Sequence, residues 1–174
     1  HRLLEEVNWL EEFDLHDDDL LHTLGKFDVT EETLRQYIEE FRRSLREDNV
    51  VKYLTRGNQP DTIHGNPVQW EAWRERRFCI SLENDDGTET LWNGVIDRVN
   101  VAKDSSGKYI AATLLDYKTD AVTEETLAGK AKTYQPQLLT YRKVLNAITE
   151  IDEVEIETGL LFLGSDLYIP VDSI

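Results

Sequence analysis

The stretches LWNGVIDRVNV, residues 91–101, and YIAATLLDYKT, residues 109–119, decide the fold and the candidate site of this chain. Both are rich in β-branched and aromatic residues, a composition typical of β-strands. The segment DSSG, residues 104–107, lies between them and is typical of a turn. The two stretches therefore predict a hairpin of two strands.

Charged residues interrupt both strands on faces that are otherwise apolar. Because side chains alternate between the two faces of a strand, Asp97 shares a face with one set of residues. Asp116 and Lys118 share a face with a second set on the other strand. The neighbours of Asp97 are Leu91, Val95, Val99 and Val101, and those of the second pair are Ile110, Ala112 and Leu114. A carboxylate among aliphatic side chains is costly unless a partner or a metal compensates it. We expect a site here, and the alternative is an Asp–Lys pair on a half-exposed sheet.

The pairing register decides whether these charges meet. If the hairpin closes tightly around 105–106, Asp97 faces Leu114, and Asp116 lies diagonally at about 7–8 Å between Cα atoms. A register shifted by two residues sets Asp97 opposite Asp116, whereas a one-residue slip separates them onto opposite faces. Lys118 follows about 6.6 Å further along the face of Asp116. Two carboxylates and an ammonium group in this arrangement suit Mg²⁺ or Mn²⁺ and phosphate chemistry.

Composition limits the class of protein. A chain of 174 residues with 40% hydrophobic content is large enough for one domain with a core of its own. The single cysteine, Cys79, allows no internal disulfide and no four-cysteine iron–sulfur cluster or zinc site, which is typical of a reducing compartment. No apolar run approaches the roughly 20 residues of a membrane span, and no charged-then-apolar pattern in the sequence suggests secretion. We expect a cytoplasmic protein without a membrane partner.

The net charge of −16 opposes binding to nucleic acid, because phosphates attract basic surfaces. Most of these acidic residues are expected to form a solvated surface. The chain begins without Met and directly on a helical pattern, so we expect a fragment of a longer protein. Partner domains would then supply a basic channel.

The remaining pattern predicts an α/β fold with a mixed sheet of four or five strands flanked by helices. The expected helices are 1–11, a short one within 14–25, 30–46, a short one after a loop that follows Lys118, and a longer one at about 130–148, and 57–67 is an expected loop. The expected strands are 74–83, 89–101, 109–119, 154–163 and 167–171. One domain, 1–174, would consist of a helical insert at 14–67 and a core at 70–174.

A stripe of polar side chains follows the long late helix. Tyr134, Gln137 and Tyr141 lie at positions i, i+3 and i+7 and therefore share one face. The packing side of the same helix is formed by Leu138, Leu145 and Ile148. The alternative is that Gln137 lies beside the packing side of the helix without any functional role.

Taken together, these segments resemble the RecB-like branch of the PD-(D/E)XK nuclease superfamily. The matching motifs are GVIDR at 94–98, DYKT at 116–119 and YxxQLxxY at 134–141, in the same order and context. Glu75, three residues before Phe78, matches an acidic position of the family, and His1 before RLLE resembles the histidine that opens its first helix. Within the branch, the chain looks most like the C-terminal nuclease domain of an AddA- or RecB-type helicase–nuclease subunit.

The resemblance implies a restriction-endonuclease-like core and a Mg²⁺ site, in which Mn²⁺ can substitute and which has no iron–sulfur cluster. The implied metal ligands are Asp97, Asp116, the backbone carbonyl of Tyr117 and the imidazole of His1. Lys118 would orient or help to deprotonate the attacking water and stabilise charge on the phosphate.

The same resemblance assigns supporting roles. Gln137 would position a water or the DNA backbone, Tyr141 would support Gln137 or pack on a sugar, and Glu75 would hold Lys118 or a second cation. The implied activity is that of a DNA exonuclease in double-strand break repair and recombination, in the bacterial cytoplasm. The implied partners are DNA, helicase domains of the same chain and a second subunit.

Two other functions stay open at this stage. The chain could be an inactive nuclease fold that is kept for DNA binding or scaffolding. It could also be an interaction domain whose acidic surface recruits a basic partner, with Asp97 and Asp116 merely ion-paired.

Overall fold

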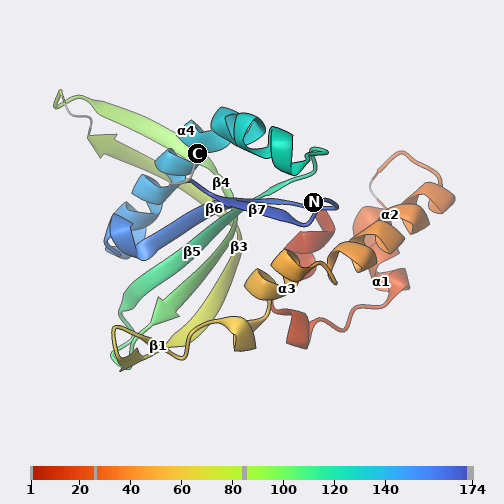
Figure 1. Cartoon of the computed structure of the whole chain (residues 1–174), viewed down its shortest axis with the longest axis horizontal. Coiled ribbons are helices and arrows are strands. Elements are labelled where there is room, and N and C mark those ends of the chain that lie inside the picture. Colours follow the sequence, from red (N-terminus) through yellow and green to blue (C-terminus); the bar gives the residue numbers. More distant parts are fainter. Residues whose placement is uncertain (1, 26, 84–85, 172–174) are drawn as a thin grey trace.

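Five strands form the central sheet in a computed structural model of the chain, which describes residues 2–25, 27–83 and 86–171 (Figure 1). The strands are β3 (Gln69–Glu83), β4 (Glu89–Lys103), β5 (Tyr109–Lys118), β6 (Ile156–Phe162) and β7 (Leu167–Pro170), and they lie in this order. Only the β5–β6 pair is parallel, and the other three pairs are antiparallel. The predicted α/β fold with a mixed sheet is confirmed.

The connection between the parallel strands β5 and β6 is one long helix, α4 (Glu124–Thr149). The sequence predicted a short helix and then a second one from about residue 130, so the predicted break is wrong. Pro136 lies within α4, and the hydroxyl of Thr140 donates to the Pro136 carbonyl at 3.0 Å. One backbone carbonyl near the proline thus gains a side-chain donor.

The N-terminal half is helical, as predicted, but in shorter pieces. Its elements are η1 (Arg2–Glu6), η2 (Leu10–Glu12), α1 (Asp17–Leu24), α2 (Glu31–Ser44), α3 (Asp48–Leu54) and η3 (Arg56–Asn58). A small hairpin of β1 (Thr62–Ile63) and β2 (Asn66–Pro67) stands in the predicted loop, and η4 (Glu153–Glu155) precedes β6. Thr30 caps α2, accepting a hydrogen bond from the Thr33 N–H at 3.3 Å.

The predicted continuous helix over residues 1–11 is wrong, since the structure has two short 3₁₀ segments there. The buried guanidinium of Arg98 donates to the carbonyls of Val7 at 2.9 Å and Asn8 at 2.7 Å. A continuous α-helix over 1–11 would use the Val7 carbonyl for its own i to i+4 bond, and the Asn8 carbonyl would lie in its last turn. A tertiary contact therefore competes with the local helical pattern.

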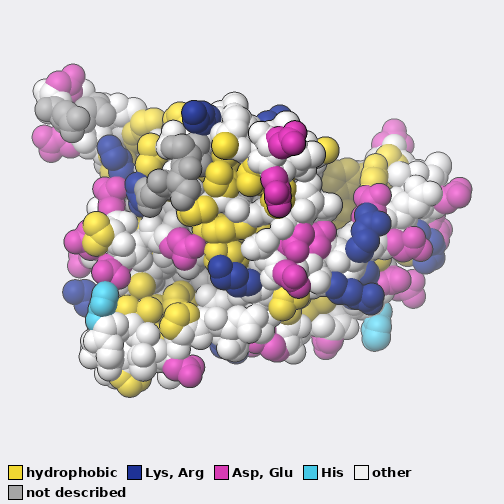
Figure 2. All heavy atoms as spheres, viewed as in Figure 1, with side chains coloured by type: hydrophobic (Ala, Val, Ile, Leu, Met, Phe, Trp, Pro, Cys, Tyr) yellow, Lys and Arg dark blue, Asp and Glu magenta, His cyan; other side chains and the backbone are white. Residues whose placement is uncertain are grey.

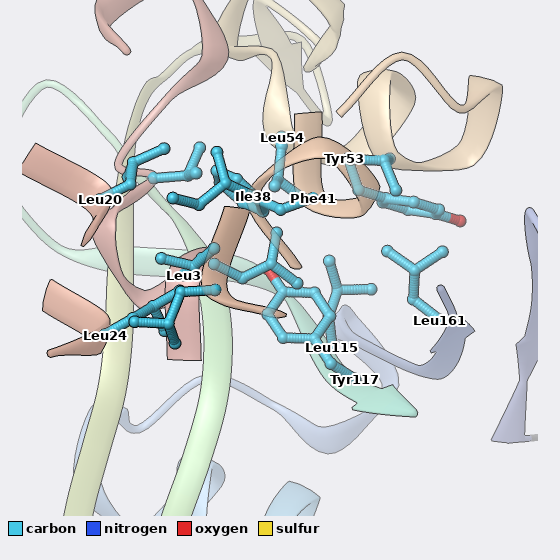
Figure 3. Packing of buried hydrophobic residues seen from close by; sticks show 14 residues of the cluster. Leu3, Leu20, Leu24, Ile38, Phe41, Tyr53, Leu54, Leu115, Tyr117 and Leu161 are labelled. Carbon is cyan, nitrogen blue, oxygen red and sulfur yellow. The ribbon is translucent and has the colours of Figure 1, made fainter. Parts of the chain in front are cut away.

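Hydrophobic side chains cover both faces of the sheet. On one face the N-terminal helices pack on Leu115, Tyr117 and Leu161 (Figure 3). On the other face, residues of α4 such as Leu138 and Leu145 form a second cluster with the sheet. Figure 2 shows acidic side chains spread over both the sheet and the helical part of one face of the molecule. The chain is thus a sheet between two helical layers.

No helix in residues 2–25, 27–83 and 86–171 is long and apolar enough to cross a membrane.

The register between β4 and β5 is the second of the two that the sequence allowed. Val99 pairs with Leu114 and Arg98 with Leu115, so the tight-hairpin register, in which Asp97 would face Leu114, is not the one that forms. An irregularity between Ala102 and Lys103 shifts the register beyond the tight hairpin. The regular pairs end at Arg98 and Leu115, and continuing the same count aligns Asp97 with Asp116.

The predicted unbroken alternation along β4 is also wrong. Ile96 and Val99, three residues apart, belong to the same core cluster, as do Trp73 and Phe78 on β3, five residues apart. Neither spacing fits one face of a regular strand. The alternation of β3 changes between Trp73 and Phe78, where Glu75 has a left-handed backbone with φ of 47°, and that of β4 changes between Ile96 and Val99. The irregularity lies beside Asp97, at the candidate site.

Candidate active site

Three acidic residues lie at matching positions of β3, β4 and β5, counted from the regular pairs beside them. Arg74 pairs with Arg98 and Arg76 with Ile96, so Glu75 stands opposite Asp97 in the register. The regular pairs of β4 and β5 end at Arg98 and Leu115, and one step further the same count aligns Asp97 with Asp116. Like charges directly opposite one another are destabilising in a sheet unless a cation compensates them. The row therefore needs positive charge, which is the first physical sign of a site.

Lys118 supplies one such charge. Its Nζ atom lies 2.5 Å from Oδ2 of Asp116, and the exposed fractions of the two side chains are 15% and 4%. The two residues share a face because they are two positions apart on β5. The pair is therefore an ion pair at the buried end of a strand, and not the surface pair that was the alternative.

The carboxylate of Asp97 is tied to β5 by its backbone. The Tyr117 N–H donates a hydrogen bond to Oδ2 of Asp97 at 2.8 Å. This bond joins the two strands beyond the last regular pair, and it brings the Tyr117 peptide beside the carboxylate. Asp97 itself is half-buried. Asp97, Asp116, Tyr117 and Lys118 thus form one cluster, as the sequence predicted.

The helix α4 places two more of the predicted residues above this cluster. The Gln137 side-chain amide donates to the Tyr141 hydroxyl at 2.8 Å. Burial raises the pKa of Tyr141, and the negative charges of Asp116 and Asp97 raise it further. The phenol therefore lies within electrostatic reach of both carboxylates, and stays protonated at neutral pH.

The Tyr141 ring is held by Phe78 of β3, in an edge-to-face contact with 5.6 Å between ring centroids. Gly94 lies beneath Phe78 on the neighbouring strand, where a Cβ atom would stand 2.8 Å from Cζ of the ring. The glycine of the GVIDR motif is therefore explained by close packing. Glu75, three residues before Phe78, makes no hydrogen bond or ion pair with Lys118 among the residues the structure describes.

The site contains one acidic residue that the sequence did not single out. Asp120 accepts a hydrogen bond from the Tyr134 hydroxyl at 2.8 Å and pairs with Lys130 at 2.7 Å. The Tyr134 ring lies below Lys118, with Nζ 4.0 Å from the ring centroid. The position of Asp120, two residues beyond Lys118, was the signal that could have found it.

The opposite face of the same strands is polar for a different reason. Arg98 is fully buried; besides the carbonyls of Val7 and Asn8, its Nε donates to Oδ1 of Asn100 at 2.9 Å. Asn100 donates to the Tyr53 carbonyl at 2.7 Å. Burial lowers the pKa of Arg98. These groups fasten the N-terminal segment to the sheet and are not part of the candidate site.

The donor set of the site fits a hard divalent cation. Mg²⁺ binds through one or two carboxylates and completes its coordination with water and phosphate oxygens, and Asp97, Asp116 and the Tyr117 carbonyl are such oxygen donors. Across the residues that the structure covers, no three His, Cys, Asp or Glu side chains are grouped to hold a metal ion. His1, the fourth predicted ligand, lies outside the described residues.

Comparison of the chain with models of protein families gives no match, and comparison with curated proteins gives none either. The assignment of a function therefore depends on the sequence motifs and on the geometry above.

Proposed function

We propose that this chain is a Mg²⁺-dependent deoxyribonuclease domain of the PD-(D/E)XK type, in the RecB-like branch. The observation that carries the proposal is the ion pair of Asp116 and Lys118 at the buried end of β5, with Asp97 opposite in the register. Two carboxylates and a lysine at the ends of adjacent strands are suited to metal-assisted hydrolysis of a phosphodiester. The five-stranded mixed sheet flanked by helices is compatible with the restriction-endonuclease-like core that we propose, and the motifs in the sequence support the same assignment.

The residues of the chain divide the reaction between them. Asp97, Asp116 and the Tyr117 carbonyl would hold the cation, and Glu75 stands in the same row for a second one. When bound, Mg²⁺ polarises a phosphoryl oxygen and makes water more acidic. The Lys118 ammonium orients the attacking water and neutralises charge that develops on the phosphate. Water attacks in line, without a covalent intermediate.

Two residues of α4, Gln137 and Tyr141, would contribute to the same reaction from the helix side of the sheet. The Gln137 side chain, whose amide already donates to Tyr141, orients a water or a DNA backbone oxygen. Tyr141 fixes Gln137, and Phe78 fixes Tyr141. A network in which each donor is held by the next keeps the reacting groups within small displacements of a productive arrangement.

The net negative charge of the chain suggests that it functions together with other domains. A net charge of −16 repels DNA, so neighbouring domains have to supply the basic surface. This fits the exonuclease domain of an ATP-dependent helicase–nuclease that processes double-strand breaks. The alternative is a nuclease fold without catalysis, kept for DNA binding or scaffolding.

Cleavage of labelled linear DNA, single- and double-stranded, in Mg²⁺ and in Mn²⁺ tests the proposal. Asp116→Asn keeps the shape of the buried side chain and removes its charge, and should abolish cleavage. Glu71→Gln, which neutralises an exposed partner of Lys103, is the matched control and should cleave normally. Cleavage that survives Asp116→Asn would refute the assignment, and a folded chain that neither cleaves DNA nor binds Mn²⁺ would favour the scaffold.

A further inference from the structure

Lys118 has a second contact that the proposed mechanism does not use. The aromatic ring of Tyr134 lies under its ammonium group, with Nζ 4.0 Å from the ring centroid. A cation at this distance from the face of an aromatic ring is attracted by the quadrupole of the ring. Tyr134 lies on α4 and is partly buried against the core on that face of the sheet. Lys118 is therefore held from the helix side as well as by Asp116 on its own strand.

The ring is itself fixed in position. The Tyr134 hydroxyl donates to Oδ2 of Asp120 at 2.8 Å, and Lys130 lies 2.7 Å from the other oxygen, Oδ1. Both carboxylate oxygens of Asp120 are thus engaged by residues one turn apart on α4. Because Asp120 follows Lys118 by two residues, the contacts close a loop from β5 to α4 and back.

A divalent cation would weaken the contact of Lys118 with Asp116 but not its contact with the Tyr134 ring. A cation bound by Asp116 competes with Lys118 for the same carboxylate, because both are positive. The aromatic ring carries no charge for which a Mg²⁺ ion could compete in this way. The ring is then the contact that keeps the ammonium group beside the reacting phosphate.

We propose that Tyr134 and Asp120 are positioning residues for Lys118, with the ring holding the ammonium group and the carboxylate holding the ring. The proposal rests on the proposed function, because it takes from it the role of Lys118 in hydrolysis. Neither residue needs to touch DNA. Their loss should reduce kcat and leave KM for DNA nearly unchanged.

The other end of β5 supplies a matched control. Lys103 lies 2.6 Å from Glu71 and 4.8 Å from the centroid of the Tyr109 ring. The same three kinds of side chain meet there, away from Asp97 and from α4. Tyr109→Leu therefore removes a ring from beneath a lysine without touching the candidate site.

The kinetic test compares graded variants with this control. Tyr134→Leu removes the ring and should lower kcat about tenfold, which is the scale of a partly desolvated cation–π contact. Tyr134→Phe keeps the ring and loses only the hydrogen bond from its hydroxyl to Asp120, so kcat should fall less than in Tyr134→Leu. Asp120→Asn weakens the same hydrogen bond and should have a similarly small effect on kcat. Tyr109→Leu should not change kcat. An unchanged kcat in Tyr134→Leu, or a loss that appears only in KM, would overturn the proposal.

A second readout needs neither metal nor DNA. Acetylation of each lysine in the metal-free protein is followed by mass spectrometry, with the exposed Lys108 as internal reference. Lys118 should react about tenfold faster in Tyr134→Leu than in the wild type, whereas Lys108 should not change. If Tyr134→Leu does not fold, Asp120→Asn, which changes a partly exposed carboxylate, carries the same comparison.

The cleavage rate and the acetylation rate together distinguish a failure of the positioning contact from a failure of the proposed nuclease function. Unchanged acetylation of Lys118 in folded Tyr134→Leu protein overturns the positioning contact, whatever the chain does to DNA. Faster acetylation in a chain that never cleaves DNA supports the contact and refutes the proposed function. Faster acetylation together with a lower kcat supports both.

Discussion

Two clusters, one at each end of β5, contain the same three kinds of side chain in different surroundings. The residues at the C-terminal end are Lys118, Asp116 and Tyr134, and those at the N-terminal end are Lys103, Glu71 and Tyr109. The lysine–carboxylate distances are 2.5 Å and 2.6 Å, and the distances from lysine to ring centroid are 4.0 Å and 4.8 Å. The chemistry at the two ends is nearly identical.

What differs is burial and the neighbouring charge. The side chain of Asp116 is 4% exposed and that of Glu71 is 45% exposed. The register of β4 and β5, continued one step beyond Arg98 and Leu115, also aligns Asp116 with Asp97, whereas Glu71 pairs with Val101. An exposed ion pair is screened by water and contributes little. The comparison teaches that a site is defined by a second carboxylate in register and by low exposure, and not by the residue types alone.

The largest difference between the two ends should be seen in catalysis. Lys118→Met removes the ammonium group from the buried pair, and DNA cleavage should fall about 10³-fold because the charge on the reacting phosphate is no longer stabilised. Lys103→Met removes the same group from the exposed pair and should leave the rate unchanged. The measurement is the initial rate of cleavage under saturating Mg²⁺. Equal losses of cleavage rate in Lys118→Met and Lys103→Met would contradict a special role for the lysine at the buried end.

Burial at the C-terminal end should also be visible in alkaline unfolding. Burial raises the pKa of Tyr117 from 10.0 to about 12, because the phenol lies inside the core between the sheet and the N-terminal helices. Its proton therefore stabilises the folded state fully below about pH 10, and that stabilisation is lost as the pH rises through about 12.

Urea unfolding between about pH 8 and about pH 11 tests this prediction. Above about pH 10 the wild type should lose roughly 1.4 kcal/mol per pH unit more than Tyr117→Phe. Tyr109→Phe, at the exposed end of the strand, removes a tyrosine outside this cluster and serves as the control. Parallel curves for the wild type and Tyr117→Phe would contradict the burial argument.

A packing change can disturb the buried end without altering any charge. Gly94→Ala places a Cβ atom 2.8 Å from Cζ of Phe78, so the ring that supports Tyr141 has to move. We expect a loss of about 2 kcal/mol in unfolding free energy, which is typical of overpacking, and a lower rate of cleavage. Gly129→Ala, which meets nothing within 4 Å on α4, is the control and should not destabilise the protein. A Gly94→Ala protein as stable as the wild type would show that the packing is looser than described.

The smallest effect should be at the exposed end. Glu71→Gln removes one partner of a pair that is largely in contact with water, and Tm should change by no more than about 2 °C. Differential scanning calorimetry at low and at moderate salt measures this change. A large, salt-independent loss would mean that the exposed pair is as important to the fold as the buried one.

Much of the fold could be predicted because local patterns and tertiary contacts agree. The strands 109–119 and 154–163 are apolar on both faces, and the structure covers both faces with helices. The helix over 1–11 failed because Arg98, distant in sequence, takes its carbonyls. The phase change at Glu75 could not be predicted from alternation, since it depends on a left-handed backbone that no residue type there requires.

The candidate site was predictable where its residues lie close together in sequence. Asp116 and Lys118 are two residues apart, so any strand brings them onto one face. The opposition of Asp97 and Asp116 depended on an irregularity near Lys103, and the sequence allowed either of two registers. Asp120 escaped notice because its partners, Tyr134 and Lys130, come from α4, and only the folded chain brings them beside it.

Binding of Mn²⁺ to the metal-free chain, measured by isothermal titration calorimetry, tests the central claim most directly, because it does not need DNA or partner domains. The wild type and Glu71→Gln should both bind Mn²⁺, and Asp116→Asn should lose that binding, since its carboxylate is the buried oxygen donor. Binding that persists unchanged in Asp116→Asn, or that is absent from the folded wild type, would contradict a cation site at the buried end of β5.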